Sequence, residues 1–285
     1  MLHRTETMND LSAALSSART LAIGTLRATL LANHGKEGVS EKAFRDEWIA
    51  RLRECPDFTR SGWYDPPPFG MAVHCGHEDD APGFAHSSLR PAEQWPSERL
   101  IDWRGGLMYA YCSPIDLASR VPADFGITLY FGKRKSIRKH FARVVQLSHA
   151  VLDLVEADTT CWSLLEQTKQ LFDDAGVRSN VASVTDVVPL DLGHSLPRVP
   201  AALIGDDREL KPAARVFVKD NRLFLSESRD FPLSSAERMT IEPSLVSALD
   251  VTLPQVSPHY VVCISAGRVS RLTEGDSLLR ELELV

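Results

Sequence analysis

The sequence predicts an α+β fold with an antiparallel sheet, and three observations lead to this class. Most residues with helical spacing of apolar side chains precede Gly176. Short strand-like runs follow it and fill most of residues 181–285. Helices and strands do not alternate regularly, as they would in a parallel βαβ fold. The 285 residues are expected to form a single domain, with residues 1–10 flexible.

Composition is typical of a globular protein with a sizeable core, because 44% of the residues are hydrophobic and 25% are charged. The net charge of -6 argues against a nucleic-acid partner, and the basic cluster at 133–139 is interpreted as a solvated helix start rather than a phosphate-binding patch. No run approaches the roughly 20 apolar residues of a membrane span, so no membrane partner is expected. Five cysteines without close pairing, and no signal-peptide core, predict reduced thiols and a cytoplasmic location.

Two helices are predicted first. The helix at 11–33 ends where Gly35 and Gly38 interrupt the apolar spacing. Ser40 is a suitable N-cap for the next helix, which Cys55-Pro56 ends. Apolar residues on one face of these helices are Leu15, Ala18, Leu21, Ala22, Leu26 and Leu30, then Phe44, Trp48 and Leu52.

Residues 61–100 are rich in Gly, Pro, Asp and His, and they predict a loop with one short strand at 71–74. Three interpretations of its polar cluster stay open: a self-contained metal site, a polar surface loop, or single residues that line a pocket built elsewhere. The cluster consists of His74, His77, His86, Glu78, Asp79 and Asp80.

The middle and the end of the chain alternate between strands and helices in blocks. Strands are predicted at 107–113 and 125–131. A helix at 136–156 is expected to begin with Ser136 as N-cap, and one at 160–175 to begin after Thr159 or Thr160 and end at Gly176. Further strands are predicted at 181–188, 215–218, 222–225, 239–241, 260–265 and 268–272, with a hairpin turn at 218–222.

Several of these pieces have a characteristic order. Asp124 opens a strand that ends at Gly132, eight residues later, and two helices follow. A Gly193-His194 pair and a Glu242-Pro243 pair come next. Over roughly residues 10–275 this order resembles the pita-bread fold of the methionine aminopeptidase, prolidase and creatinase family. The resemblance implies a curved antiparallel sheet with helices on its outer face and a metal site in its centre.

The resemblance also implies a set of metal ligands: Asp124, His194 and Glu242 match three of the family's five. The first family Asp is expected eleven residues before Asp124, where Ser113 stands, and Asp116 lies nearby in a loop. The last family Glu is expected around 258–262, where His259 is a possible replacement.

His86 occupies the place of the family's substrate-side His, where it would act as the catalytic residue that donates a hydrogen bond or a proton to the substrate. Each ligand also has a purely structural interpretation. Asp124 would then cap the strand start, His194 would be a satisfied loop histidine, and Glu242 would face solvent.

Three functions follow from this incomplete ligand set. The first is a metal-dependent hydrolase that acts on a peptide or other C–N bond of a small molecule or short peptide. The second is a mononuclear iron-dependent oxidase or lyase, and the third is a metal-free binding protein derived from a peptidase. One divalent ion at most (Fe, Mn, Zn or Co) is expected, because a serine cannot bridge two cations as a carboxylate does. A homodimer is expected, as in many members of the family.

Overall fold

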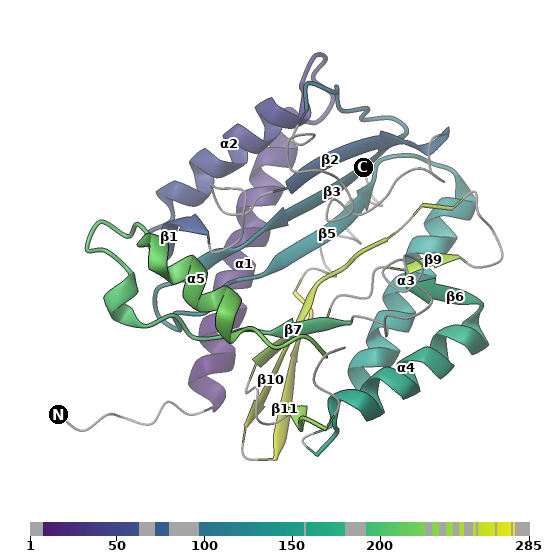
Figure 1. The fold of residues 1–285 in the computed structure, drawn as a ribbon. Coiled ribbons are helices and arrows are strands. Elements are labelled where there is room, and N and C mark those ends of the chain that lie inside the picture. The colour runs from purple at the N-terminus through teal and green to yellow at the C-terminus, as the bar shows by residue number, and fades with distance from the viewer. Residues whose placement is uncertain are drawn as a thin grey trace.

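The computed structural model describes residues 8–62, 72–79, 97–156, 158–179, 192–225, 230–233, 238–241, 245–247, 253–254, 256–265, 267–274 and 276. Helices α1 (Met8–Asn33) and α2 (Glu41–Glu54) lie on one side of a central sheet, and α3 (Lys135–Asp153) and α4 (Cys161–Ala175) lie on the other (Figure 1). Within these ranges no helix is long and apolar enough to cross a membrane. The α+β class is confirmed, whereas the flexibility predicted for residues 1–10 falls mostly on residues that are not described.

The central sheet has three antiparallel strands in the order β2 (Ala72–His77), β3 (Gly106–Cys112) and β5 (Phe125–Tyr130). All seven residues of β3 are buried, because each face of the strand meets a different cluster. Alternate side chains contact either the α3 and α4 cluster or the α1 and α2 cluster: Leu107, Tyr109 and Tyr111 on the first side, and Met108, Ala110 and Cys112 on the second. The sheet is therefore covered on both sides.

A second antiparallel sheet has the order β11 (Arg268–Leu272), β10 (Tyr260–Ser265), β8 (Arg238–Ile241) and β7 (Gly193–Ser195). The two sheets meet where the residues before β10 run along β5. There the His259 amide donates to the Gly126 carbonyl at 3.0 Å, and the Ser257 amide donates to the Thr128 hydroxyl at 2.9 Å. Two short antiparallel ladders complete the described strands: β1 (Phe58–Gly62) with β4 (Pro114–Asp116), and β6 (Val177–Ser179) with β9 (Leu245–Ser247).

The predicted helix caps are confirmed in α2 and α4 and wrong in α3. The Ser40 hydroxyl accepts the Ala43 amide at 3.2 Å, and the Thr160 hydroxyl accepts the Ser163 amide at 3.1 Å. Gly176 ends α4 with φ of 63°, the left-handed conformation that glycine adopts without strain. By contrast, α3 begins at Lys135, so Ser136 lies inside it, and no side chain caps its first turn.

The predicted strands at 215–218 and 222–225, with their hairpin, are wrong. The structure has helix α5 (Pro212–Asn221) over the first of these ranges, after the short 3-10 helix η5 (Ala201–Leu203). In the second range Phe224 forms an isolated bridge with His194. Val216, Phe217 and Val218 favour a strand by propensity, but packing decides otherwise. Ala214 and Val218 are both fully buried, one helical turn apart. The predicted strand at 181–188 lies outside the described residues.

Helix α2 is tied to the edge of the central sheet by the buried carboxylate of Glu41. Glu41 accepts the amide of Cys75 in β2 at 2.6 Å, and it accepts both the amide and the hydroxyl of Ser97 at 2.8 Å. The His74 ring nitrogen Nδ1 lies 3.4 Å from the same carboxylate. Burial raises the pKa of Glu41, but these contacts with His74, Cys75 and Ser97 outweigh it and lower the pKa overall.

The lowered pKa of Glu41 predicts an acid-sensitive contribution to stability. A carboxyl whose pKa is depressed on folding stabilises the fold above its unfolded pKa, and this stabilisation is lost as pH falls through the folded pKa. Urea unfolding should show that wild type loses stability more steeply than Glu41→Gln below about pH 4.5. At pH 7 the variant should be less stable by about 1–3 kcal/mol. Glu37→Gln at an exposed position is the control, and equal pH dependence in wild type and Glu41→Gln would contradict the prediction.

Candidate functional site

Asp124 lies directly before β5 and is almost fully buried. Its φ of 45° is in the left-handed region, which Asp tolerates better than most residues. The Tyr111 hydroxyl donates to Oδ1 at 2.7 Å. The second carboxyl oxygen, Oδ2, is buried and has no hydrogen-bond partner among the described residues. A buried acceptor of this kind is costly unless something binds it.

Ser113 stands opposite Asp124 in the antiparallel pairing of β3 with β5. The register pairs Cys112 with Phe125, and the hydrogen bond from the Ala123 amide to the Pro114 carbonyl (2.8 Å) continues the same register past Ser113. Ser113 is fully buried there. Across this ladder Asp124 therefore faces a serine.

Asp116 does not substitute for the missing carboxylate. Its Oδ2 accepts both the amide and the hydroxyl of Ser119 at 2.6 Å, which closes a local turn after β4. Burial raises the pKa of Asp116, and the bonds from Ser119 offset only part of this effect. The role of this carboxyl is thus to stabilise its own turn.

His259 lies one residue before β10 of the second sheet, and its side chain packs against residues around Asp124. Its Nε2 lies 3.1 Å from the Tyr109 hydroxyl, and its ring centroid lies 5.4 Å from that of Tyr111. The ring also covers Gly126, where an added Cβ would lie 2.6 Å from the ring carbon Cδ2. Only glycine allows this approach. Because Tyr111 contacts both Asp124 and His259, the structure brings these two predicted ligands together.

His194 lies on β7, opposite Thr240 of β8, which is opposite Val261 of β10. Its Nδ1 is 2.9 Å from the Ser195 carbonyl oxygen, and a carbonyl only accepts, so Nδ1 carries the hydrogen. In the neutral ring Nε2 then has the lone pair that a metal needs. The ring packs edge-on against Phe224 at a centroid distance of 5.9 Å.

Two predicted site residues, His86 and Glu242, lie outside the described residues. Among the residues that are described, no three His, Cys, Asp or Glu side chains form a group able to hold a metal ion. The four-ligand set of Asp124, His194, Glu242 and His259 therefore stays a prediction, as does the role of His86.

The polar cluster predicted in a loop lies partly on a strand. His74 and His77 belong to β2, which extends beyond the short strand predicted at 71–74. His74 is buried beside Glu41, while His77 lies 3.3 Å from Asp79 and 3.1 Å from Asp102 near the surface. The two imidazoles thus pair with different carboxylates.

The donor atoms near Asp124 are of the kinds that bind a divalent cation. Oδ2 of Asp124 is available to an ion, while Oδ1 already accepts the Tyr111 hydroxyl. A metal-binding histidine commonly has one ring nitrogen held by a protein group, and Tyr109 supplies that contact to His259.

The five cysteines do not supply a nucleophile. None forms a disulfide. Burial raises the pKa of Cys161 and of Cys263 to about 11, and it raises the pKa of Cys55, Cys75 and Cys112 as well. The thiolate is the reactive form, so these side chains are unreactive near neutral pH.

Sequence reasoning missed three residues of this site. Tyr109 and Tyr111 are two apart on β3, a spacing that places both side chains on one face of a strand. Arg19 falls within the apolar stripe of α1 and is completely buried. A cation at a core position of a helix was the signal that could have drawn attention to it.

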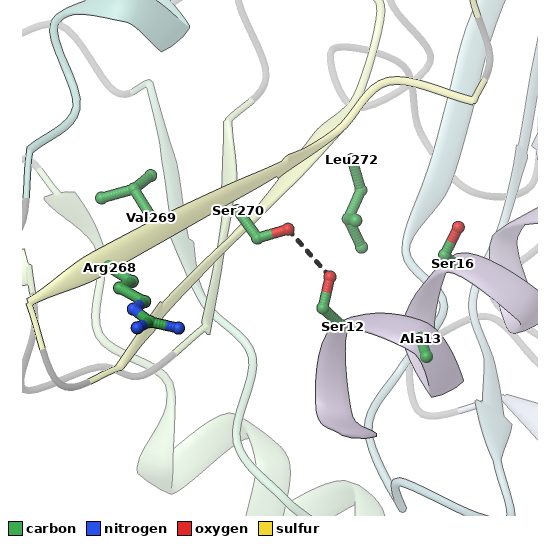
Figure 2. Close-up of a pocket in the computed structure, with 7 residues that line it drawn as sticks. All are labelled: Ser12, Ala13, Ser16, Arg268, Val269, Ser270 and Leu272. Atoms are coloured by element: carbon green, nitrogen blue, oxygen red, sulfur yellow. Dashed lines mark hydrogen bonds between the residues drawn. The ribbon is translucent and has the colours of Figure 1, made fainter. Parts of the chain in front are cut away.

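A pocket of about 470 Å³ lies elsewhere, between α1 and β11 (Figure 2). Figure 2 shows the hydroxyls of Ser12 and Ser270 pointing at each other, and they are 2.8 Å apart. None of the predicted site residues lines this pocket. Its lining residues are Ser12, Ala13, Ser16, Arg268, Val269, Ser270 and Leu272.

No protein-family model and no curated protein matches the sequence. Solved structures do match the fold. A prolidase from Thermococcus sibiricus has a TM-score of 0.60 at 16% identity, over 93% of this chain and 59% of its own. An X-Pro aminopeptidase from Thermotoga maritima has a TM-score of 0.60 at 14% identity, over 92% and 60%. A variant of Escherichia coli aminopeptidase P has a TM-score of 0.57 at 14% identity, over 97% and 60%. The chain thus spans about 60% of the length of the structures it matches.

Proposed function

We propose that this protein is a metal-dependent hydrolase with a single divalent ion. The chain has the pita-bread fold, as its similarity to solved prolidases and aminopeptidases shows. Its substrate is a small molecule or short peptide with a peptide bond or another C–N bond. The observation that carries the proposal is the buried Oδ2 of Asp124, which lacks a hydrogen-bond partner among the described residues. A cation would satisfy this oxygen, and the sequence resemblance predicts a metal ligand at the same residue.

The residues proposed to hold the ion are Asp124 and His259, together with His194 and Glu242. A bound divalent ion supplies a Lewis acid that polarises a substrate carbonyl. The protein's own contribution is to fix the ligands: Tyr111 orients the Asp124 carboxyl and Tyr109 orients the His259 ring. His86 is proposed to donate a hydrogen bond or a proton on the substrate side.

The test combines elemental analysis with variants at two positions. We expect at most one tightly held ion of Fe, Mn, Zn or Co per chain, because Ser113 leaves no bridging carboxylate. His194→Ala should abolish retention of the ion, whereas Ser113→Ala should leave it nearly unchanged. Two ions per chain at full occupancy, or an ion that survives His194→Ala, would show that the ligands are assigned wrongly.

Activity is measured on Xaa-Pro dipeptides with each metal in turn, and oxygen consumption is followed in parallel with iron. Hydrolysis that chelation stops and the metal restores supports the proposal. Oxygen consumption without peptide cleavage would contradict it and favour an oxidase.

A metal-free binding protein is the second candidate, and one observation favours it. The hydroxyls of Tyr111 and Tyr109 already engage Asp124 and His259, so these polar groups are partly satisfied by the protein itself. Calorimetry of the chelator-treated protein with Xaa-Pro peptides separates the two candidates. Binding without any ion, and without turnover when metals are added, would favour this second function.

A further inference from the structure

Arg19 of α1 connects the backbones of the two ligand candidates that the structure brings together. Its Nη1 donates to the carbonyl oxygen of Asp124 at 3.0 Å, and its Nη2 donates to the carbonyl oxygen of His259 at 2.6 Å. Asp124 precedes a strand of the central sheet, and His259 precedes a strand of the second sheet. One rigid planar guanidinium therefore spans the junction between the sheets.

The guanidinium is completely buried, so its charge must be compensated inside the protein. Its Nε donates to the carboxylate of Glu274 at 3.2 Å, which supplies the opposite charge. Among the described residues the guanidinium also contacts the Ala123 carbonyl at 3.3 Å and the ring of Phe125, whose centroid is 5.8 Å away. Each of the three guanidinium nitrogens thus donates to the segment that carries Asp124, to His259 or to Glu274.

The contacts of Arg19 hold the backbone of Asp124 in a conformation that is unfavourable by itself. Asp124 has a left-handed φ of 45°, a conformation that a residue with a side chain keeps only when its surroundings enforce it. Nη1 bonds the carbonyls on both sides of the Asp124 Cα, those of Ala123 and Asp124. Two bonds to consecutive carbonyls fix the orientation of both peptide planes and hence the direction of the Asp124 side chain.

We propose that Arg19 is a positioning residue for the cation site. It fixes the backbones of Asp124 and His259 relative to each other, so that their side chains keep their mutual placement before any cation binds. The expected effect on cation binding rests on the proposed function, whereas the expected effect on the backbone of His259 does not.

Arg19→Lys tests this role, because lysine keeps the charge for Glu274 but replaces the planar fork with a single ammonium. In chelator-treated protein, NMR should show that the amide of His259, which donates to Gly126, exchanges about tenfold faster than in wild type. Titration with Co(II) should show about tenfold weaker binding and a changed visible absorption spectrum, which reports the ligand geometry. Arg104→Lys, at an exposed position, should leave both readouts unchanged.

Glu274→Gln is the second variant, for the case that Arg19→Lys does not fold. It leaves Arg19 in place without its carboxylate partner, and about threefold faster exchange of the His259 amide is expected. An unchanged exchange rate in the folded variants overturns the proposal. Faster exchange with unchanged Co(II) affinity and spectrum overturns it too, because Arg19 would then serve only the fold. A wild-type chain that binds no Co(II) overturns the proposed function instead, and the exchange rates still decide whether Arg19 fixes the two backbones.

Discussion

Replacing Asp124 by Asn is expected to abolish cation binding while the fold stays intact. The amide has the shape of the carboxyl group and still offers an oxygen to the Tyr111 hydroxyl. It carries no negative charge, however, and neutral amide oxygens are much weaker ligands for a divalent ion than carboxylates. Equilibrium dialysis with Co(II) should show affinity lower by about a hundredfold or more, since even partners outside the first ligand shell contribute about 10–100-fold.

Urea unfolding should show that this variant keeps its stability although it loses cation binding. In the presence of chelator, Asp124→Asn should be within about 1 kcal/mol of wild type or more stable, because it relieves a buried carboxyl oxygen that lacks a partner. With Co(II) at a hundred times the wild-type Kd, wild type should gain about 2.7 kcal/mol, whereas Asp124→Asn should gain little. Asp116→Asn is the matched control, since that buried carboxyl belongs to the Ser119 turn. Wild-type stoichiometry in Asp124→Asn would reject Asp124 as a ligand.

Gly126→Ala is expected to destabilise the protein by about 3 kcal/mol through steric overlap with His259. The new Cβ would lie 2.6, 2.8 and 2.9 Å from three atoms of the imidazole ring. The ring cannot move away cheaply, because Tyr109 engages its Nε2 and the His259 backbone is bonded to Gly126 and Arg19. Cation affinity should fall together with stability, since the ring that moves is a proposed ligand.

The control for this substitution is Gly24→Ala in the middle of α1. A Cβ at Gly24 meets nothing within 4 Å, so only helix propensity changes there. This variant should be more stable than wild type by about 0.5–1 kcal/mol. Urea unfolding of both variants measures the two effects. If Gly126→Ala unfolded within about 0.5 kcal/mol of wild type, the ring of His259 would not be held over Gly126.

Local sequence patterns were sufficient for the fold class and for most of the helices. Ser40, Thr160 and Gly176 cap helices through bonds to residues three or four positions away, so neighbouring sequence contains the whole signal. The order of Asp124, Gly132 and Gly193-His194 was sufficient for the resemblance to the pita-bread fold, which the similar solved structures confirm.

The segment at 212–221 shows where local patterns fail. Its β-branched and aromatic residues predict strands, but burial of Ala214 and Val218 on one face makes it helix α5. That burial depends on partners distant in sequence, in a cluster with Ile115 and Val199. The cap of α3 was mispredicted as well, because Ser136 is a suitable cap residue by type but is the second residue of the helix.

Through its resemblance to the pita-bread family, the sequence by itself predicted the candidate site residues Asp124, His194, Glu242, His259 and His86. Only the tertiary structure decided what surrounds Asp124 and His259. It placed Ser113 opposite Asp124, engaged Asp124 and His259 with the hydroxyls of Tyr111 and Tyr109, and joined both backbones through Arg19. Arg19 lies 240 positions from His259, and Tyr109 lies 150 positions from it. Contacts over such separations arise from the packing of α1 and of two sheets, and no local spacing in a chain specifies them.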